Sequence, residues 1–235
     1  MNKKPNIVLN IPHSSVLGIF DKHIGGWTPN PHFINDCVNR WTDWWTDMLF
    51  HSDRENVETF IFPYSRFVCD AERLENDPME ETGQGILYTS FDGYKRKDLS
   101  DENIIKLLDI RRQYLKKISS SLTENSVLID CHSFPQDLSD ADICIGFNED
   151  WSYNEKIANF VVDTFTKHGY KVSVNKPFSN SITPQTSFPY TSIMIEVNKK
   201  VYMNEKLLSL ERNSRQWMRW YGCLNEVYDK ILNNQ

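Results

Sequence analysis

Short apolar runs alternate with longer amphipathic stretches along most of the chain. Runs that are typical of buried strands occupy residues 6–11, 57–62, 127–134, 143–147, 170–174 and 192–198. Apolar residues at helical spacing predict helices over residues 33–50, 100–122, 154–168 and 204–232. This alternation is typical of an α/β protein, and it predicts a three-layer α/β/α sandwich with a mixed, mainly parallel sheet of about six strands.

Polar side chains follow two of the predicted strands at the point where each apolar run stops. Asp130, His132 and Ser133 come at the end of Val127–Phe134, and Pro12 and His13 follow the first strand. Ligands of open α/β sheets bind at the carboxyl ends of the strands, so these residues are the first candidate site. The plain alternative is a strand end whose acid and imidazole are satisfied by hydrogen bonds to the backbone.

Length and composition narrow the class of protein. The chain has 235 residues, of which 40% are hydrophobic and 25% are charged, and this fits one globular domain over residues 1–235. A formal net charge of -6 argues against a nucleic-acid-binding surface. The apolar run near the start is too short for a signal peptide or a membrane span, and the five cysteines lack CxxC spacing. We therefore expect a cytoplasmic protein with reduced thiols, bound to neither nucleic acid nor membrane.

Two histidines at strand ends suggest a metal site. His13 and His132, together with one acid from the polar series Asp36, Asp43 and Asp47 on the predicted helix 33–50, make two imidazoles and a carboxylate. That donor set, with one position open to water, is typical of a catalytic zinc site. The residue types leave open which of the three acids would take part.

Further candidates are a lone acid and a pair of arginines. Glu196 lies in an apolar strand, where a carboxylate is costly unless it has a partner or a role such as general base. A buried ion pair with Lys or Arg is the alternative for Glu196. Arg66 and Arg73 bracket Asp70, and this pattern indicates either a site for an anionic substrate or a surface ion network. The chain has no G-x-S-x-G sequence, which argues against a serine hydrolase.

Five blocks of sequence, in order, resemble those of the N-formylglutamate amidohydrolase family. The blocks run over most of the chain: Pro12-His13-Ser14-Ser15, Ser65 to Arg73, Asp130-Cys131-His132-Ser133, Asn175-Lys176-Pro177-Phe178, and Ile195 to Lys199 with Tyr202-Met203. That family is similar in fold to zinc carboxypeptidases, which belong with the phosphorylase/hydrolase-like sandwiches. The resemblance implies a single zinc ion and hydrolysis of an amide bond in an acidic amino-acid derivative.

The resemblance also implies roles for individual residues. By position it makes His13, Asp43 and His132 the zinc ligands, with Asp36 as the second choice for the acid, and Glu196 the general base.

Arg66 takes the place of a catalytic group that polarises the scissile carbonyl, and Arg73, Asn175 and Tyr202 take the places of substrate-binding groups. Asp130 lies two positions before His132 on the same strand face and is placed to orient its imidazole.

The expected function is therefore zinc-dependent hydrolysis of the amide bond of a small N-acyl amino acid such as N-formylglutamate. The chain departs from the usual family pattern at Ser15 and at Glu72, where the family has Gly and Asn. The negative charge of Glu72 beside Arg73 weakens the case for formylglutamate itself. Two alternatives stay open: a carboxypeptidase- or amidase-like enzyme acting on peptide or cell-wall fragments, and a catalytically silent protein that binds a small molecule. The oligomeric state is left open.

Overall fold

The chain forms two compact units. The computed structural model describes residues 7–211 and 215–233. The first unit, called the sheet unit below, comprises Met1–Ile11, Trp45–Phe60 and Ile118–Gln235. The second, called the aromatic unit, comprises Pro12–Trp44 and Ile61–Lys117. One catalytic domain over residues 1–235 stays a prediction.

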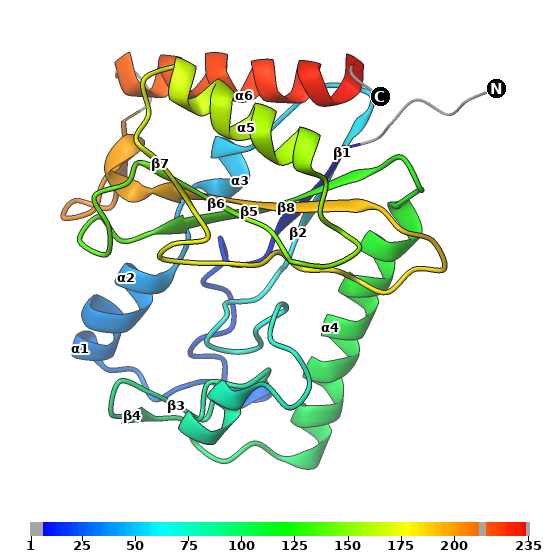
Figure 1. Ribbon diagram of the computed structural model, residues 1–235. Helices are drawn as coiled ribbons and strands as arrows, with labels where there is room; N and C mark the ends of the chain where they lie inside the picture. The colour runs from blue at the N-terminus through cyan, green and yellow to red at the C-terminus, as the bar shows by residue number, and fades with distance from the viewer. Residues whose placement is uncertain (1–6, 212–214, 234–235) are drawn as a thin grey trace. The chain divides into compact units, whose positions relative to one another are not determined.

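A six-stranded sheet forms the centre of the sheet unit. Its strands lie in the order β2-β1-β5-β8-β6-β7 (Figure 1). β1 is parallel to β5, β5 to β8 and β6 to β7, whereas β6 is antiparallel to β8. The predicted α/β fold with a mixed, mainly parallel sheet is thus confirmed. The strands are β1 (Ile7–Ile11), β2 (Val57–Ile61), β5 (Val127–Phe134), β6 (Ile143–Gly146), β7 (Val172–Val174) and β8 (Thr191–Asn198).

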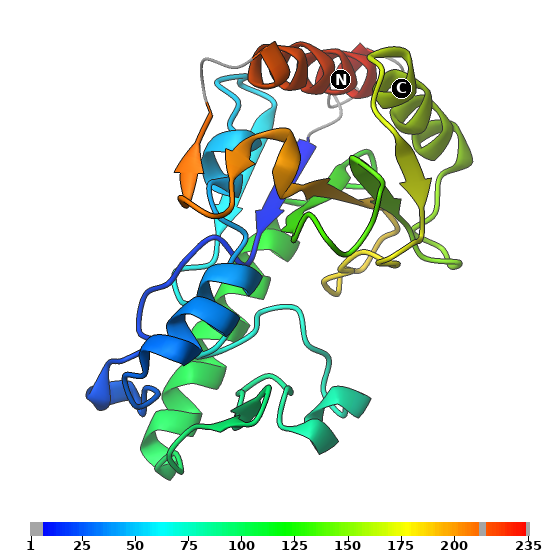
Figure 2. The same ribbon diagram turned by 90° about the vertical axis from the view of Figure 1, so that its left-hand side faces the viewer.

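Two amphipathic helices cover one face of this sheet. α5 (Glu155–Lys167) and α6 (Arg215–Asn233) lie side by side on it (Figures 1 and 2). The predicted start of this helix at residue 154 is confirmed for α5. Asn154 is its N-cap, and its side chain accepts the N–H of Ile157 at 3.2 Å. Phe165 of α5 stacks on Trp220 of α6 with ring centroids 5.5 Å apart. This packing buries the apolar side chains that the β5 sequence directs to that face.

The segment 175–190, which connects β7 to β8, is pinned to the opposite face of the sheet. The Phe178 carbonyl accepts a hydrogen bond from the Cys144 thiol at 3.3 Å. The N–H of Ile182 donates to the Asp130 carboxylate at 2.9 Å. Asp130, and His132 two positions after it on β5, therefore lie on the face that this segment crosses.

The predicted helix over residues 33–50 is interrupted. A helical stretch runs through α1 (Pro31–Phe33), a π-helical turn (Ile34–Val38) and α2 (Asn39–Trp41), and α3 (Thr46–Leu49) follows separately. Thr42 is extended with ψ 133°, and the N–H of Asp43 bonds to the carbonyl of His13 at 3.0 Å. This tertiary hydrogen bond replaces the helical one, so Asp43 lies in the break and not on a helix.

The predicted last helix over residues 204–232 begins too early. A 3₁₀ turn (Lys199–Val201) follows β8, and β9 (Met203–Asn204) then pairs with β10 (Ser209–Leu210) as a hairpin, orange in Figure 2. The Asn204 side chain accepts the N–H groups of Lys206 and Leu207 at 3.1 and 3.2 Å. Asparagine favours such turns over helix interiors, which explains the difference. α6 begins at Arg215, and residues 212–214 lie outside the described part of the chain.

Aromatic rings form the core of the aromatic unit. Phe67 packs edge-on against Trp27, Tyr88 and Phe91 at centroid distances of 6.3, 5.9 and 5.2 Å. The buried Arg96 donates to carbonyls from three separate segments, those of Gly25 and Ile24, Val68, and Tyr88. The unit contains most of α4 (Asp101–Ser121), the hairpin of β3 (Ser90–Phe91) and β4 (Tyr94–Lys95), and the 3₁₀ turns Lys22–Ile24 and Pro78–Thr82.

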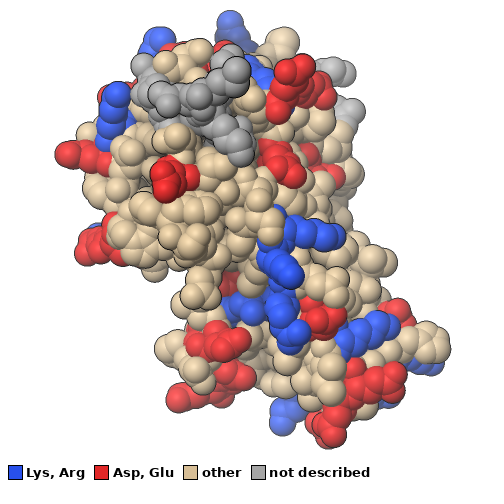
Figure 3. Space-filling view, turned by 90° about the vertical axis from the view of Figure 1, so that its right-hand side faces the viewer, with Lys and Arg blue, Asp and Glu red and all other residues tan. Residues whose placement is uncertain are grey.

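The outer surface carries charges of both signs. On the face drawn in Figure 3, Lys and Arg side chains appear together with Asp and Glu side chains, and neither sign covers that face. Among the described residues, no helix has the length and apolar character needed to cross a membrane.

Gly146 at the end of β6 allows the segment 175–190 to lie close to the sheet. A Cβ atom there would stand 2.7 Å from the Asn180 carbonyl oxygen and 2.4 Å from Cε of Met194. Because a backbone atom must move, we expect Gly146→Ala to lower the free energy of unfolding by about 1–3 kcal/mol in urea denaturation. Gly222→Ala in α6 is the matched control, since its Cβ would meet nothing within 4 Å. This control should raise stability by up to about 1 kcal/mol, and equal effects of the two variants would contradict the close approach.

Candidate metal and catalytic site

In the sheet unit, the predicted ligand His132 and the predicted base Glu196 lie on neighbouring strands. They are direct partners in the parallel pairing of β5 with β8, and Cys144 of β6 is opposite Glu196 on the other side. Directly paired residues share one face of a sheet, so these side chains form a row. His132 and Glu196 are 5% and 7% exposed, which places both in a low-dielectric setting.

The His132 ring is held by the acid two positions before it on the same strand. Its Nε2 lies 3.1 Å from Oδ1 of Asp130, which is the contact that the sequence predicts for this pair. A ring that donates Nε2–H to a carboxylate carries its lone pair on Nδ1. In this arrangement Nδ1 is the nitrogen of His132 that can ligate a metal.

In the aromatic unit, the predicted ligands His13 and Asp43 lie next to each other. Nδ1 of His13 is 3.8 Å from Oδ2 of Asp43, and both residues are 3% exposed. Nε2 of His13 is 2.9 Å from Oδ1 of Asp70, so this ring also presents Nδ1 as its metal-binding nitrogen. Asp36, the second choice for the acid, is exposed on the π-helical turn. Of Asp43 and Asp36, Asp43 is therefore the one that adjoins Nδ1 of His13.

Asp70 connects both predicted arginines to His13. Its Oδ2 accepts from Nη2 of Arg66 at 3.2 Å and from the Tyr88 hydroxyl at 3.1 Å, and it lies 3.8 Å from Nε of Arg73. Burial alone would raise the pKa of Asp70, but its neighbours His13, Arg66 and Arg73 hold that pKa well below its usual value. Arg66 and Arg73 therefore form an ion network with Asp70, which was one of the two alternatives from the sequence. Its acid is buried, because Asp70 is 1% exposed.

Asn175 and Tyr202, the predicted substrate-binding residues, both lie in the sheet unit. Asn175 follows β7 with φ 53°, and its Oδ1 accepts the N–H of Phe147 at 3.0 Å. Tyr202 is fully buried, and its N–H donates to the Lys199 carbonyl at 3.2 Å. Asn175 therefore has a defined structural role, and a role of either residue in binding stays a prediction.

The residue types and contacts suit a zinc ion. Two imidazoles that each offer Nδ1, and a carboxylate beside one of them, are typical donors for zinc. Each imidazole is held through Nε2 by a buried carboxylate, which is the usual support for a histidine ligand. Within the aromatic unit, the 3.8 Å between His13 and Asp43 matches two neighbouring ligands of one ion.

Sequence reasoning missed Asn10 and Tyr88 and assigned no site role to Asp70. Asn10 donates to Asp130 at 2.8 Å, and its signal in the sequence is a lone polar residue in the apolar run of β1. Tyr88 has no local signal, because it belongs to a long polar stretch between Asp77 and Gly93.

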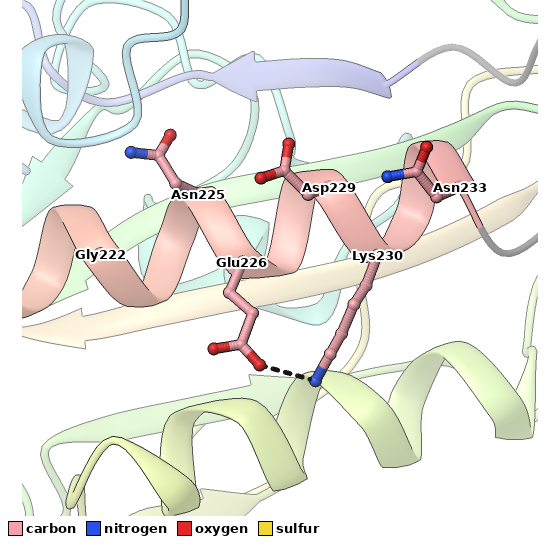
Figure 4. Close-up of a pocket in the computed structure, with 6 residues that line it drawn as sticks. All are labelled: Gly222, Asn225, Glu226, Asp229, Lys230 and Asn233. Carbon is pink, nitrogen blue, oxygen red and sulfur yellow. Dashed lines mark ion pairs between the residues drawn. The ribbon is translucent and has the colours of Figure 1, made fainter.

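A pocket of about 340 Å³ on α6 contains none of the predicted site residues. Asn225 and Asp229 lie on one side of the helix, and Glu226 and Lys230 face α5 (Figure 4). Glu226 contacts His168, Lys167 and Lys230, and the hydrogen bond from His168 is the main cause that lowers its pKa to about 2. These groups join α5 to α6, which accounts for the polar lining.

Comparison with known proteins gives a consistent family and fold. Residues 6–203 match the family model described as N-formylglutamate amidohydrolase. The structure of N-formylglutamate amidohydrolase from Ralstonia eutropha JMP134 has a TM-score of 0.79 at 16% identity, covering 97% of this chain and 93% of that one. A gene product from Agrobacterium tumefaciens has a TM-score of 0.69 at 15% identity, covering 97% and 92%. No curated protein matches the chain in sequence. At these identities the two structures show the shared fold.

We expect Asp70→Asn to destabilise the protein by about 2–4 kcal/mol, because Arg66 and Arg73 would lose their buried counter-charge. Asp77→Asn is the matched control, since Asp77 faces Arg73 at 3.7 Å near the surface, and it should cost less than about 1 kcal/mol. Urea denaturation of the metal-free proteins measures both.

The lowered pKa means that Asp70 stabilises the fold above its unfolded pKa and loses this effect as the pH falls through its folded pKa. The difference between wild type and Asp70→Asn should therefore shrink in acid, and equal costs of the two variants at neutral pH would rule out the buried network.

Proposed function

Because the chain belongs to the N-formylglutamate amidohydrolase family, we propose that it is a zinc-dependent hydrolase of the amide bond in a small N-acyl amino acid such as N-formylglutamate. The family match supports an enzyme that hydrolyses amides. The zinc ion, the substrate and the residue roles given below are proposals. A cytoplasmic location and the absence of nucleic-acid and membrane partners stay predictions from the sequence.

The observation that carries the proposal is the common arrangement of the two histidines. His13 bonds through Nε2 to Asp70 at 2.9 Å, and His132 bonds through Nε2 to Asp130 at 3.1 Å. Each ring is thus fixed in the tautomer that offers Nδ1 to a metal. A histidine ligand almost always donates its other ring N–H to a carboxylate, a backbone carbonyl or water, and both of these rings have a buried carboxylate in that place.

The pairing of β1 with β5 supports a shared ion. These strands are parallel, with Asn10 opposite Asp130. His13 follows the end of β1 by two residues, and His132 follows Asp130 by two residues. The carboxyl ends of parallel strands lie at the same edge of a sheet, and each histidine comes at or just after the carboxyl end of its strand. We propose His13, Asp43 and His132 as the ligands of one zinc ion.

The remaining groups would carry out the proton transfers and hold the substrate. When bound, zinc supplies a Lewis acid that polarises the scissile carbonyl and acidifies a water molecule. Glu196 would accept a proton from the attacking water and deliver it to the leaving nitrogen as the C–N bond breaks, giving a carboxylic acid and an amine. Arg66 would stabilise the oxyanion, and Arg73, Asn175 and Tyr202 would contact the substrate.

One observation favours a second substrate class. Arg66 and Arg73 both face the negative charge of Asp70, and Glu72 lies 3.9 Å from Nε2 of His13. These acids reduce the positive potential that an acidic substrate would meet. An amide in a peptide or cell-wall fragment is therefore the alternative substrate.

Metal analysis combined with a hydrolysis screen tests the proposal. We expect about one zinc ion per chain and release of amine from N-acyl amino acids, with loss of turnover after chelation and recovery with added zinc. Peptide and cell-wall fragments in the same screen distinguish the second substrate class. A protein that binds no divalent ion and turns over no amide would contradict the enzyme and favour a catalytically silent binding protein.

Glu196→Gln tests the general base separately from the metal. This change removes the proton acceptor but keeps the side-chain shape, so kcat should fall about 100- to 10,000-fold. The zinc content should stay the same, because Glu196 is not a proposed ligand. Glu155→Gln, in the exposed first turn of α5, is the control and should leave kcat within about twofold. If Glu196→Gln retains full turnover, another group is the base.

A further inference from the structure

Asn10 is the one polar residue in the sequence of β1, Ile-Val-Leu-Asn-Ile, and it is fully buried. A buried amide is costly unless its hydrogen bonds are satisfied, so its presence in an apolar strand calls for a specific partner. The sheet register supplies that partner, because Asn10 lies directly opposite Asp130 in the parallel pairing of β1 with β5.

The Asp130 carboxylate receives hydrogen bonds from three directions. Oδ1 accepts from Nδ2 of Asn10 at 2.8 Å and lies 3.1 Å from Nε2 of His132. Oδ2 accepts the backbone N–H of Ile182 at 2.9 Å. Asp130 itself is 3% exposed, so water contributes little to holding it.

We propose that Asn10 is a positioning residue for His132. A carboxylate turns easily about its χ2 bond, and a bond to the ring alone would leave that rotation open. The amide of Asn10 on one oxygen and the N–H of Ile182 on the other lock the carboxylate plane. The locked Oδ1 in turn sets the tautomer and the ring angle of His132. This inference rests on the proposed function, because it assigns the ring orientation to metal binding.

Asn148 provides a matched comparison for Asn10. Its side chain pins the same segment 175–190, since Nδ2 donates to the Ser181 carbonyl at 3.0 Å and Oδ1 accepts the Ser181 N–H at 3.1 Å. Both residues are therefore side-chain amides that hold structure close to Ile182, and the contact with Asp130 is what distinguishes Asn10. A general effect of loosening this part of the sheet unit should appear in both variants.

The test compares wild type, Asn10→Leu and Asn148→Leu as full-length proteins. Leucine has nearly the branched shape of asparagine but donates no hydrogen bond. Zinc affinity is measured by competition with a chromophoric chelator, and the visible absorption of the cobalt-loaded proteins reports the ligand geometry. We expect Asn10→Leu to weaken zinc binding by about tenfold or more and to change the cobalt spectrum. Asn148→Leu should leave the affinity within about twofold and the spectrum unaltered.

The outcomes separate this inference from the proposed function. If wild type binds zinc and both variants bind it equally well, or are weakened equally, Asn10 has no positioning role and the metal site stands. If wild type binds neither zinc nor cobalt, the proposed function and this inference both fail. If Asn10→Leu does not fold, Asn10→Ser, which is too short to reach Oδ1 of Asp130, takes its place with the same expected loss of affinity.

Discussion

The parallel pairing of β5 with β1 on one side and with β8 on the other is the interaction on which the candidate site depends. It sets Asn10 opposite Asp130 and His132 opposite Glu196. Side chains alternate between the faces of a strand, so a shift of one residue in either pairing would move a partner to the opposite face. The apolar residues between these polar ones, buried under α5 and α6, hold the register in place. Burial of these apolar side chains thus stabilises the fold of the sheet unit and also keeps Asp130, His132 and Glu196 in register.

Two buried carboxylates support the two candidate histidine ligands, but each is compensated in a different way. Asp70 in the aromatic unit is surrounded by guanidinium groups and a phenol, and Asp130 in the sheet unit is held by neutral amides. A charge-rich network binds its members strongly and tolerates the loss of one charge poorly. Neutral donors cost less to bury and give the carboxylate a defined direction. Direction is the property that an imidazole ligand requires.

The arginines illustrate how a structural role and a binding role compete. A guanidinium that faces a buried acid uses some of its N–H donors to bind that acid. Only the remaining N–H donors could bind a substrate. In the proposed role, the pair at Arg66 and Arg73 would therefore suit recognition of a polar carbonyl better than neutralisation of a strongly acidic group. Substrate preference within the family fold would then depend on the acids beside these arginines, here Asp70 and Glu72.

Local patterns in the sequence determined the strands and much of the candidate site. The continuous apolar runs predict β1, β5 and β8, and the polar residues where the first two runs stop predict His13 and His132, because both signals depend only on neighbouring residues. The tertiary structure alone decided the break at Thr42, where the Asp43 N–H bonds to a distant carbonyl. It alone brought Asp70 to His13, 57 residues apart, and Asn10 to Asp130, 120 residues apart. Such hydrogen bonds depend on strand register and loop path, which no short stretch of sequence encodes.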